Sequence, residues 1–132
     1  MSGITNINEL LGSMQPALID ELFVFCTVKG QLAEYLNLAP IATFVETEGL
    51  TLVLTKDTAD KAGLQYEGVF RQITLTVHSS LEAVGLTAAV STKLTSKGIS
   101  ANVIAAYYHD HIFVSADKAE QALSTLNELS NI

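Results

Sequence analysis

Hydrophobic and polar residues alternate regularly in the second half of the chain. Residues 70–77 repeat with period two, which predicts a strand with one buried and one polar face. The next apolar residues fall four apart, at Leu86, Val90 and Leu94, and predict a helix with one buried side. Gly98 follows at a position where glycine commonly ends a helix.

Two further strands extend this pattern. Residues 99–108 and 111–114 are rich in apolar and aromatic residues, and His109-Asp110 between them predicts a hairpin turn. Strand, helix and hairpin are most of a ferredoxin-like βαββαβ unit. An apolar stripe over residues 119–129 predicts its second helix, after which too little chain remains for a fourth strand. That strand must be absent or come from the first half.

The first half repeats the order of strand, connection, two strands and helix. Residues 22–28 are continuously apolar and predict a central, buried strand. Residues 41–55 predict a hairpin in which Gly49 takes a positive φ. Residues 55–62 predict a short helix that Thr55 caps.

These patterns together predict an α+β fold of two ferredoxin-like units, with antiparallel sheets covered by helices. Residues 1–66 would form the N-terminal unit, and residues 67–132 the C-terminal unit, interlocked with the first. A short helix over residues 6–14, which Asn6 can cap, would open the first unit. No linker rich in Pro, Gly or Ser separates the halves, which favours interlocked units over separable domains.

The composition indicates which kinds of partner the chain can bind. Hydrophobic residues make up 48% of the 132 residues and charged residues 16%, against about 25% charged in an average globular protein. We therefore expect part of the apolar surface to meet another copy, so that the chain forms a homo-oligomer. The net charge of −7 and the lack of a basic run argue against binding to nucleic acid or to an anionic membrane.

The chain lacks the signals of export and membrane insertion. No basic stretch followed by an apolar core opens it, and no segment approaches the roughly 18 apolar residues of a membrane span. We therefore expect a cytoplasmic protein. The single cysteine, Cys26, lies in an apolar run and is expected to be a buried strand thiol.

The second half resembles an ACT domain, on the residues 74–81, Val84-Gly85-Leu86, Gly98–Val103 and Asp110–Val114. It is most similar to the tandem ACT-like modules of small bacterial proteins of unknown function and of the cytosolic arginine sensor of animal cells. Residues 44–54 resemble the companion domain that precedes it in those bacterial proteins. The resemblance covers nearly the whole chain and implies a regulatory module that binds amino acids.

The resemblance also implies where a ligand would bind. In ACT pairs, the loop after the first strand meets the start of the second strand of a neighbouring unit. A helix amino terminus at that loop suits a carboxylate, and Gly85 leaves room for a close approach. The ligand-binding residues predicted in this way are His78, Ser79, Ser80, Leu81, Val84, Gly85, Ile99, Ser100, Ala101 and Asn102.

Each of these residues also has a structural interpretation. Ser79 and Ser80 are ordinary helix caps, with Glu82 completing a capping box. Gly85 permits tight packing of the helix on the sheet. Asn102 can satisfy an edge backbone group.

Two other groups of residues carry candidate chemistry. His109 and His111 are two residues apart and could share a metal, but they flank a turn and no further ligand is evident beyond His78. His78, Ser79 and Asp110 are the residue types of a hydrolase, but no nucleophile elbow surrounds them. We therefore predict no metal, no cofactor and no catalysis.

The leading hypothesis is a non-catalytic regulatory module that binds a small molecule, an amino acid in the first place. Binding would occur at a junction between units, within the chain or across a dimer, and would report to an unidentified protein partner. The alternative is a structural oligomerisation module with no ligand.

Overall fold

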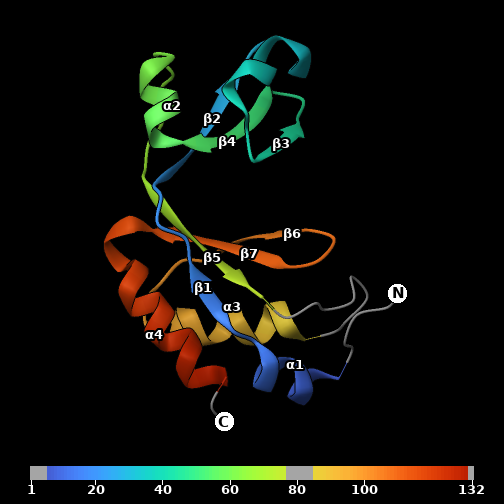
Figure 1. Ribbon diagram of the computed structural model, residues 1–132, viewed down its shortest axis with the longest axis vertical. Coiled ribbons are helices and arrows are strands. Elements are labelled where there is room, and N and C mark those ends of the chain that lie inside the picture. The colour runs from blue at the N-terminus through green and yellow to red at the C-terminus, as the bar shows by residue number, and fades with distance from the viewer. Residues whose placement is uncertain (1–5, 77–84, 131–132) are drawn as a thin grey trace. The chain divides into compact units, whose positions relative to one another are not determined.

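The computed structural model describes residues 6–76 and 85–130, which form an α+β fold of antiparallel strands and covering helices (Figure 1). The predicted fold class is thereby confirmed. The chain divides into two compact units, and each is described by itself. Unit 1 comprises the residues up to Asp20 together with those from Arg71 on, and unit 2 comprises Glu21–Phe70.

The bounds predicted for the two domains, residues 1–66 and 67–132, stay a prediction. By packing, the residues up to Asp20 go with the C-terminal part of the chain. Unit 2 is thus inserted between two segments of unit 1.

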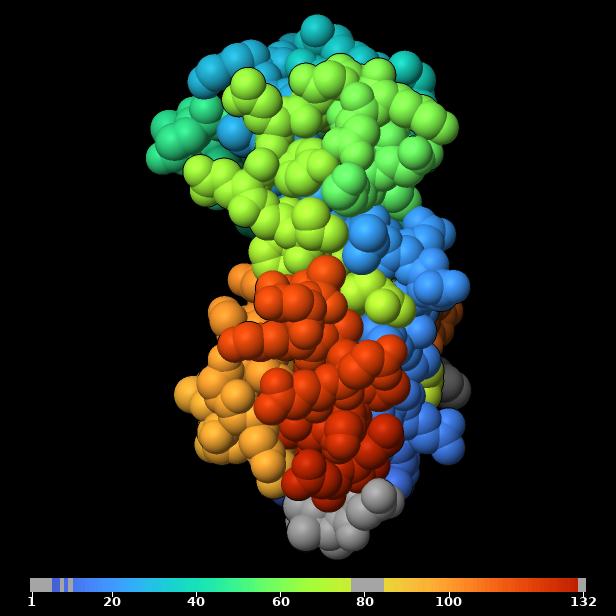
Figure 2. All heavy atoms as spheres, turned by 90° about the vertical axis from the view of Figure 1, so that its left-hand side faces the viewer, coloured from blue at the N-terminus to red at the C-terminus, as the bar shows by residue number. Residues whose placement is uncertain are grey.

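Unit 1 holds a sheet in the order β1-β5-β7-β6, with helices against one face (Figure 1). The strands are β1 (Pro16–Leu18), β5 (Phe70–Leu75), β6 (Asn102–Ala105) and β7 (Asp110–Ser115). The helices are α1 (Ile7–Ser13), α3 (Leu86–Ser96) and α4 (Ala119–Ser130), with the 3-10 turn η2 (Ala116–Lys118) before α4. Helix α4 lies beside both α3 and β1, as Figure 2 shows.

The core of unit 1 lies between this sheet and its helices. Alternate residues of β5 and β7 point into it, and so do Leu86, Val90 and Leu94 of α3, which confirms the predicted helix face. Its buried members are Met14, Ile73, Leu75, Leu86, Val90, Leu94, Ile99, Ile112, Val114, Ala119, Ala122, Leu126 and Leu129.

The N-terminal segment supplies the strand that the second half lacks. Strand β1 pairs antiparallel with β5, with Ala17 opposite Thr74. The pairing is extended by the Ile19 amide, which donates to the Gln72 carbonyl at 2.9 Å. The guanidinium of Arg71 adds two hydrogen bonds to the Ile19 carbonyl, at 2.9 and 3.0 Å. The last strand is therefore not absent but comes from the first half of the chain, the second of the two alternatives given by the sequence.

Helix α3 ends in a Schellman motif. Gly98 has a φ of +73°, and its amide donates to the Thr95 carbonyl at 2.9 Å. The amide of Ile99 donates to the Leu94 carbonyl at 3.0 Å. Leu94 and Ile99 are both buried, so the motif carries its usual hydrophobic contact. The predicted stop at Gly98 is confirmed.

Unit 2 is a smaller sheet in the order β3-β4-β2. Phe70 pairs with Phe23 on the other side of β2, so β2 is central, as predicted. The elements of unit 2 are β2 (Phe23–Val28), the 3-10 helix η1 (Leu32–Leu38), β3 (Ala42–Val45), β4 (Leu50–Thr55) and α2 (Lys56–Lys61). Cys26 is buried in this core, as expected for a strand thiol.

Gly49 has a different role from the one predicted. Glu46 and Gly49 exchange backbone hydrogen bonds of 3.0 and 3.3 Å, which leaves Thr47-Glu48 as the loop of the β3–β4 hairpin. Gly49 is not among the glycines with positive φ. A Cβ atom at Gly49 would lie 2.7 Å from Thr27 Oγ1. Glycine is needed there for the close approach of β2.

The hairpin between β6 and β7 turns earlier than predicted. Ala105 pairs with Asp110, and the Ala106 amide donates to the His109 carbonyl at 3.0 Å. The tip is therefore Tyr107-Tyr108. The prediction of a turn at His109-Asp110 was wrong because Asp110 is already the first residue of β7.

Within the described part of the chain, no helix has the length and apolar character needed to cross a membrane.

Replacing glycine by alanine should have opposite effects on stability at Gly98, in the Schellman motif, and at Gly12, within α1. Gly98→Ala should lower the free energy of unfolding by about 1–2 kcal/mol, because a side chain is disfavoured at positive φ. A Cβ at Gly98 would meet nothing within 4 Å, so backbone conformation alone is tested. Gly12→Ala is the matched control, since this site is equally open but lies within α1. Urea unfolding should show it unchanged or up to about 1 kcal/mol more stable. Equal stability of wild type and Gly98→Ala would contradict the assignment.

Candidate functional site

The predicted ligand site is described in part. His78, Ser79, Ser80, Leu81 and Val84 lie outside the described residues, as does the capping box at Glu82. The other predicted residues, Gly85, Ile99, Ser100, Ala101 and Asn102, all belong to unit 1.

Gly85 is the N-cap of α3, with a φ of +104° and no side-chain cap. Caps at Ser79 and Ser80 would place Gly85 inside the helix, whereas Gly85 directly precedes α3, and its positive φ explains the glycine. A Cβ there would lie 3.5 Å from the Ile7 side chain, an ordinary contact. The helix begins with Leu86, and its first turn holds no acidic residue. The first turn of α3 therefore has no carboxylate of its own to neutralise the positive end of the helix dipole.

The start of β6 divides into buried and exposed residues. Ile99 is buried at 2% exposure, and Ala101 packs against the same core. Ser100 and Asn102 are exposed. Asn102 Nδ2 donates to the Phe113 carbonyl at 3.3 Å, which is the edge-satisfying role considered from the sequence. This bond leaves Asn102 Oδ1 as an acceptor.

The described residues of the predicted site lie at opposite ends of α3. Gly85 precedes the helix and Ile99 follows its C-terminal motif. Eleven helical residues span about 16 Å at 1.5 Å per residue. One small molecule cannot touch both Gly85 and the residues that follow Gly98 within a single unit 1.

A polar network on the other face of the sheet went unrecognised in the sequence. Gln72 Nε2 donates to Thr74 Oγ1 at 2.8 Å, and both atoms lie near His111 Nδ1, at 3.1 and 2.9 Å. Because both neighbours can donate, Nδ1 accepts and the ring proton of neutral His111 lies on Nε2. The alternation of Gln72 and Thr74 along β5 was the signal that could have revealed it.

Burial shapes the protonation of this hairpin. It lowers the pKa of His111 and raises the pKa of Asp110. The rings of His109 and His111 stand 6.5 Å apart and nearly perpendicular. No group of three metal-ligating side chains occurs among the described residues. A metal held between His109 and His111 would therefore find no third protein ligand among the described residues.

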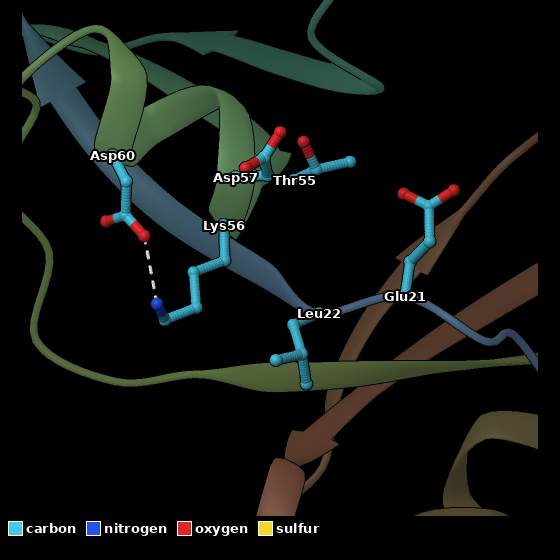
Figure 3. A pocket seen from close by; sticks show the side chains of 6 residues that line it. All are labelled: Glu21, Leu22, Thr55, Lys56, Asp57 and Asp60. Carbon is cyan, nitrogen blue, oxygen red and sulfur yellow. Dashed lines mark hydrogen bonds and ion pairs between the residues drawn. The ribbon is translucent and has the colours of Figure 1, made fainter.

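Unit 2 has a shallow pocket of about 410 Å³ near the start of α2 (Figure 3). Lys56 Nζ lies 2.9 Å from Asp60 Oδ2, and Tyr66 donates to Asp60 Oδ1 at 2.6 Å. These hydrogen bonds, from Tyr66 first and Lys56 second, lower the pKa of Asp60. The lining residues are Glu21, Leu22, Thr55, Lys56, Asp57 and Asp60. With three carboxylates and one ammonium group that is already paired, this wall does not suit a carboxylate ligand.

The chain is similar to known proteins in both family and fold. Two ACT domain models match the chain, over residues 2–71 and 68–128. A Vibrio cholerae protein of unknown function, described as a possible transport protein, is 60% identical; the match covers 98% of this chain and 99% of that one, with a TM-score of 0.88. No curated protein matches in sequence.

More distant structures share the fold alone. An Agrobacterium tumefaciens protein has 12% identity and a TM-score of 0.69, with 89% of each chain covered. The regulatory subunit of aspartate kinase from Thermus thermophilus has 13% identity and a TM-score of 0.64, with 89% of this chain and 98% of that one covered. Because the first family model alone spans more than half of the residues, this chain belongs to the ACT domain family, with two ACT domains in tandem.

Proposed function

We propose that this protein is a non-catalytic regulatory module that binds an amino acid. The observation that carries the proposal is that ACT domain models together span residues 2–128. A chain of the same fold is the regulatory subunit of aspartate kinase in Thermus thermophilus. Ligand binding would need no cofactor or metal, and we expect the module to act in the cytoplasm on a protein partner yet to be identified.

The two ends of α3 offer complementary chemistry for an amino acid. The first backbone amides of α3 suit the carboxylate, because they lie at the positive end of the helix dipole. Asn102 Oδ1 and the exposed Ser100 hydroxyl can accept hydrogen bonds from the ammonium group. The positions His78, Ser79, Ser80, Leu81 and Val84 stay in the proposed site as predicted.

The separation of the two ends of α3 favours a site assembled from two copies. Since one ligand cannot reach both ends of the helix, we place the carboxylate side on one copy and the ammonium side on a second copy. A ligand held in this way stabilises one arrangement of the two copies by its higher affinity for that arrangement. The partner protein would respond to that arrangement.

The alternative function, an oligomerisation module without a ligand, has its own support. Ile99 is a core residue, and Asn102 already bonds to the neighbouring strand. These structural roles account for both residues at their positions without a ligand.

Thermal melts against the twenty amino acids decide between the two functions. At least one amino acid should stabilise the protein, by about 2.7 kcal/mol at a concentration one hundred times its Kd. Asn102→Ala should remove most of that shift. Asn127→Ala, at an exposed position of α4, is the matched control and should keep it. If no amino acid moves the midpoint at millimolar concentration, the oligomerisation function takes its place.

Mixing of two variants tests the assembly from two copies. Thr87→Glu puts a carboxylate in the first turn of α3, where it repels a ligand carboxylate without straining the helix. Thr92→Glu, exposed in the middle of α3, is its control and should bind normally. Thr87→Glu and Asn102→Ala should each bind poorly alone by calorimetry.

Mixed in equal amounts, these two variants should recover about a quarter of the wild-type binding capacity. Half of the randomly formed dimers would be mixed, and each would contain one intact site of two. Recovery would fail if each copy carried its own complete site.

A further inference from the structure

A histidine takes part in the polar network on the face of the unit 1 sheet opposite the core. His111 belongs to β7, where Ile112 and Val114 point into the core. Because side chains alternate along a strand, His111 points to the other face. There it meets the side chains of Gln72 and Thr74 from β5. Strands β5 and β7 are the two central strands of this sheet, and the network joins them side chain to side chain.

The hydrogen bonds of this network require a neutral imidazole. Nδ1 of His111 lies 2.9 Å from Thr74 Oγ1 and 3.1 Å from Gln72 Nε2. Gln72 Nε2 also donates to Thr74 Oγ1 at 2.8 Å, so the hydroxyl can pass its own hydrogen on to Nδ1. A protonated imidazole carries a hydrogen on both ring nitrogens. Its Nδ1–H group would face the amide N–H of Gln72 at a distance that suits one donor and one acceptor.

The surroundings leave this network little room to relax. Thr74 is buried, and β1 holds its strand from the other side, with Ala17 opposite Thr74. Ile104 of β6 lies opposite His111, and its side chain offers no hydrogen-bonding group. A protonated ring is therefore accommodated by a turn of the Gln72 amide and by a Thr74 hydroxyl that accepts instead of donating.

The charged groups around His111 favour the neutral ring. Burial is the main cause of its lowered pKa, and the neighbouring His109 lowers this pKa further. Asp110 has the smallest effect and acts in the opposite direction. Burial raises the pKa of Asp110 itself, which weakens it as a counter-charge. The side chains that face His111 from β5 and β6 carry no charge, so the ring is neutral near pH 7.

We propose that His111 is a proton-operated switch between β5 and β7. In the neutral form, Nδ1 connects β7 to Gln72 and Thr74 of β5. A proton taken up from solvent at Nδ1 turns the Gln72 amide away and reverses the hydrogen bond with Thr74, which weakens this connection. None of the residues predicted to bind a ligand takes part, so the switch goes beyond the proposed function and does not depend on it.

The switch makes the stability of unit 1 depend on pH. The pKa of His111 in the folded protein lies below the value of 6.5 for a free side chain. The unfolded chain therefore takes up this proton first as the pH falls. The contribution of His111 to the free energy of unfolding is fully present above about pH 6.5. It is lost as the pH falls from there to the lower pKa of the folded state.

Nitrogen NMR of the histidine rings tests the neutral form. Neutral His111 should carry its hydrogen on Nε2, with Nδ1 as the acceptor. Gln72→Glu should raise the titration midpoint of His111 by about one pH unit or more, because a carboxylate accepts from Nδ1–H and favours the charged ring. Gln121→Glu adds the same charge at an exposed position of α4, and this matched control should leave the midpoint in place. A neutral ring with its hydrogen on Nδ1, or equal midpoints in the two variants, would overturn the proposal.

Urea unfolding at several pH values tests the link to folding. His111→Asn keeps a polar acceptor near the position of Nδ1 but takes up no proton. Between about pH 7.5 and about pH 5.5, the urea midpoint of wild type should fall further than that of His111→Asn. Equal losses in the two proteins would contradict the switch. Neither result bears on amino-acid binding, which the thermal melts test separately.

Discussion

The pairing of β1 with β5 is the interaction on which the rest of unit 1 depends. It brings the N-terminal segment back to the C-terminal part of the chain and completes the sheet that α3 and α4 cover. Backbone groups of β5 that would otherwise be left at an edge find partners in this way. Met14, just before β1, enters the same core, so backbone pairing and side-chain burial support each other. Unit 2 is in effect an insertion between the first strand and the remainder of unit 1.

The elements were predictable from the sequence wherever local physics determines them. The cap of α1 at Asn6, the cap of α2 at Thr55 and the stop at Gly98 all follow from neighbouring residues, and the structure confirms them. β1 was not predictable, because three residues beginning with proline carry no periodic pattern. Only the missing fourth strand indicated that some segment had to take this place. The turn at Tyr107-Tyr108 was mislocated because register depends on the partner strand rather than on turn-forming residues alone.

Three glycines, Gly49, Gly85 and Gly98, show why the site was harder to predict than the fold. Gly98 and Gly85 adopt positive φ at the two ends of α3, whereas Gly49 makes room for Thr27 on a neighbouring strand. Glycine is thus needed for its backbone conformation at Gly85 and Gly98, and for its lack of a side chain at Gly49. Sequence alone could not separate these roles.

Some residues of the proposed site also hold the fold together, which affects how a bound ligand could act. Ile99 closes the Schellman motif of α3, and Asn102 bonds to β7 across the hairpin. A ligand on Ser100 and Asn102 would therefore act on residues that already join the end of α3 to the sheet. Any shift it causes must come from different affinities for two arrangements of the chain or of its copies. A site built on such residues can transmit binding without a separate relay, because the ligand would contact the same residues that hold helix and strand together.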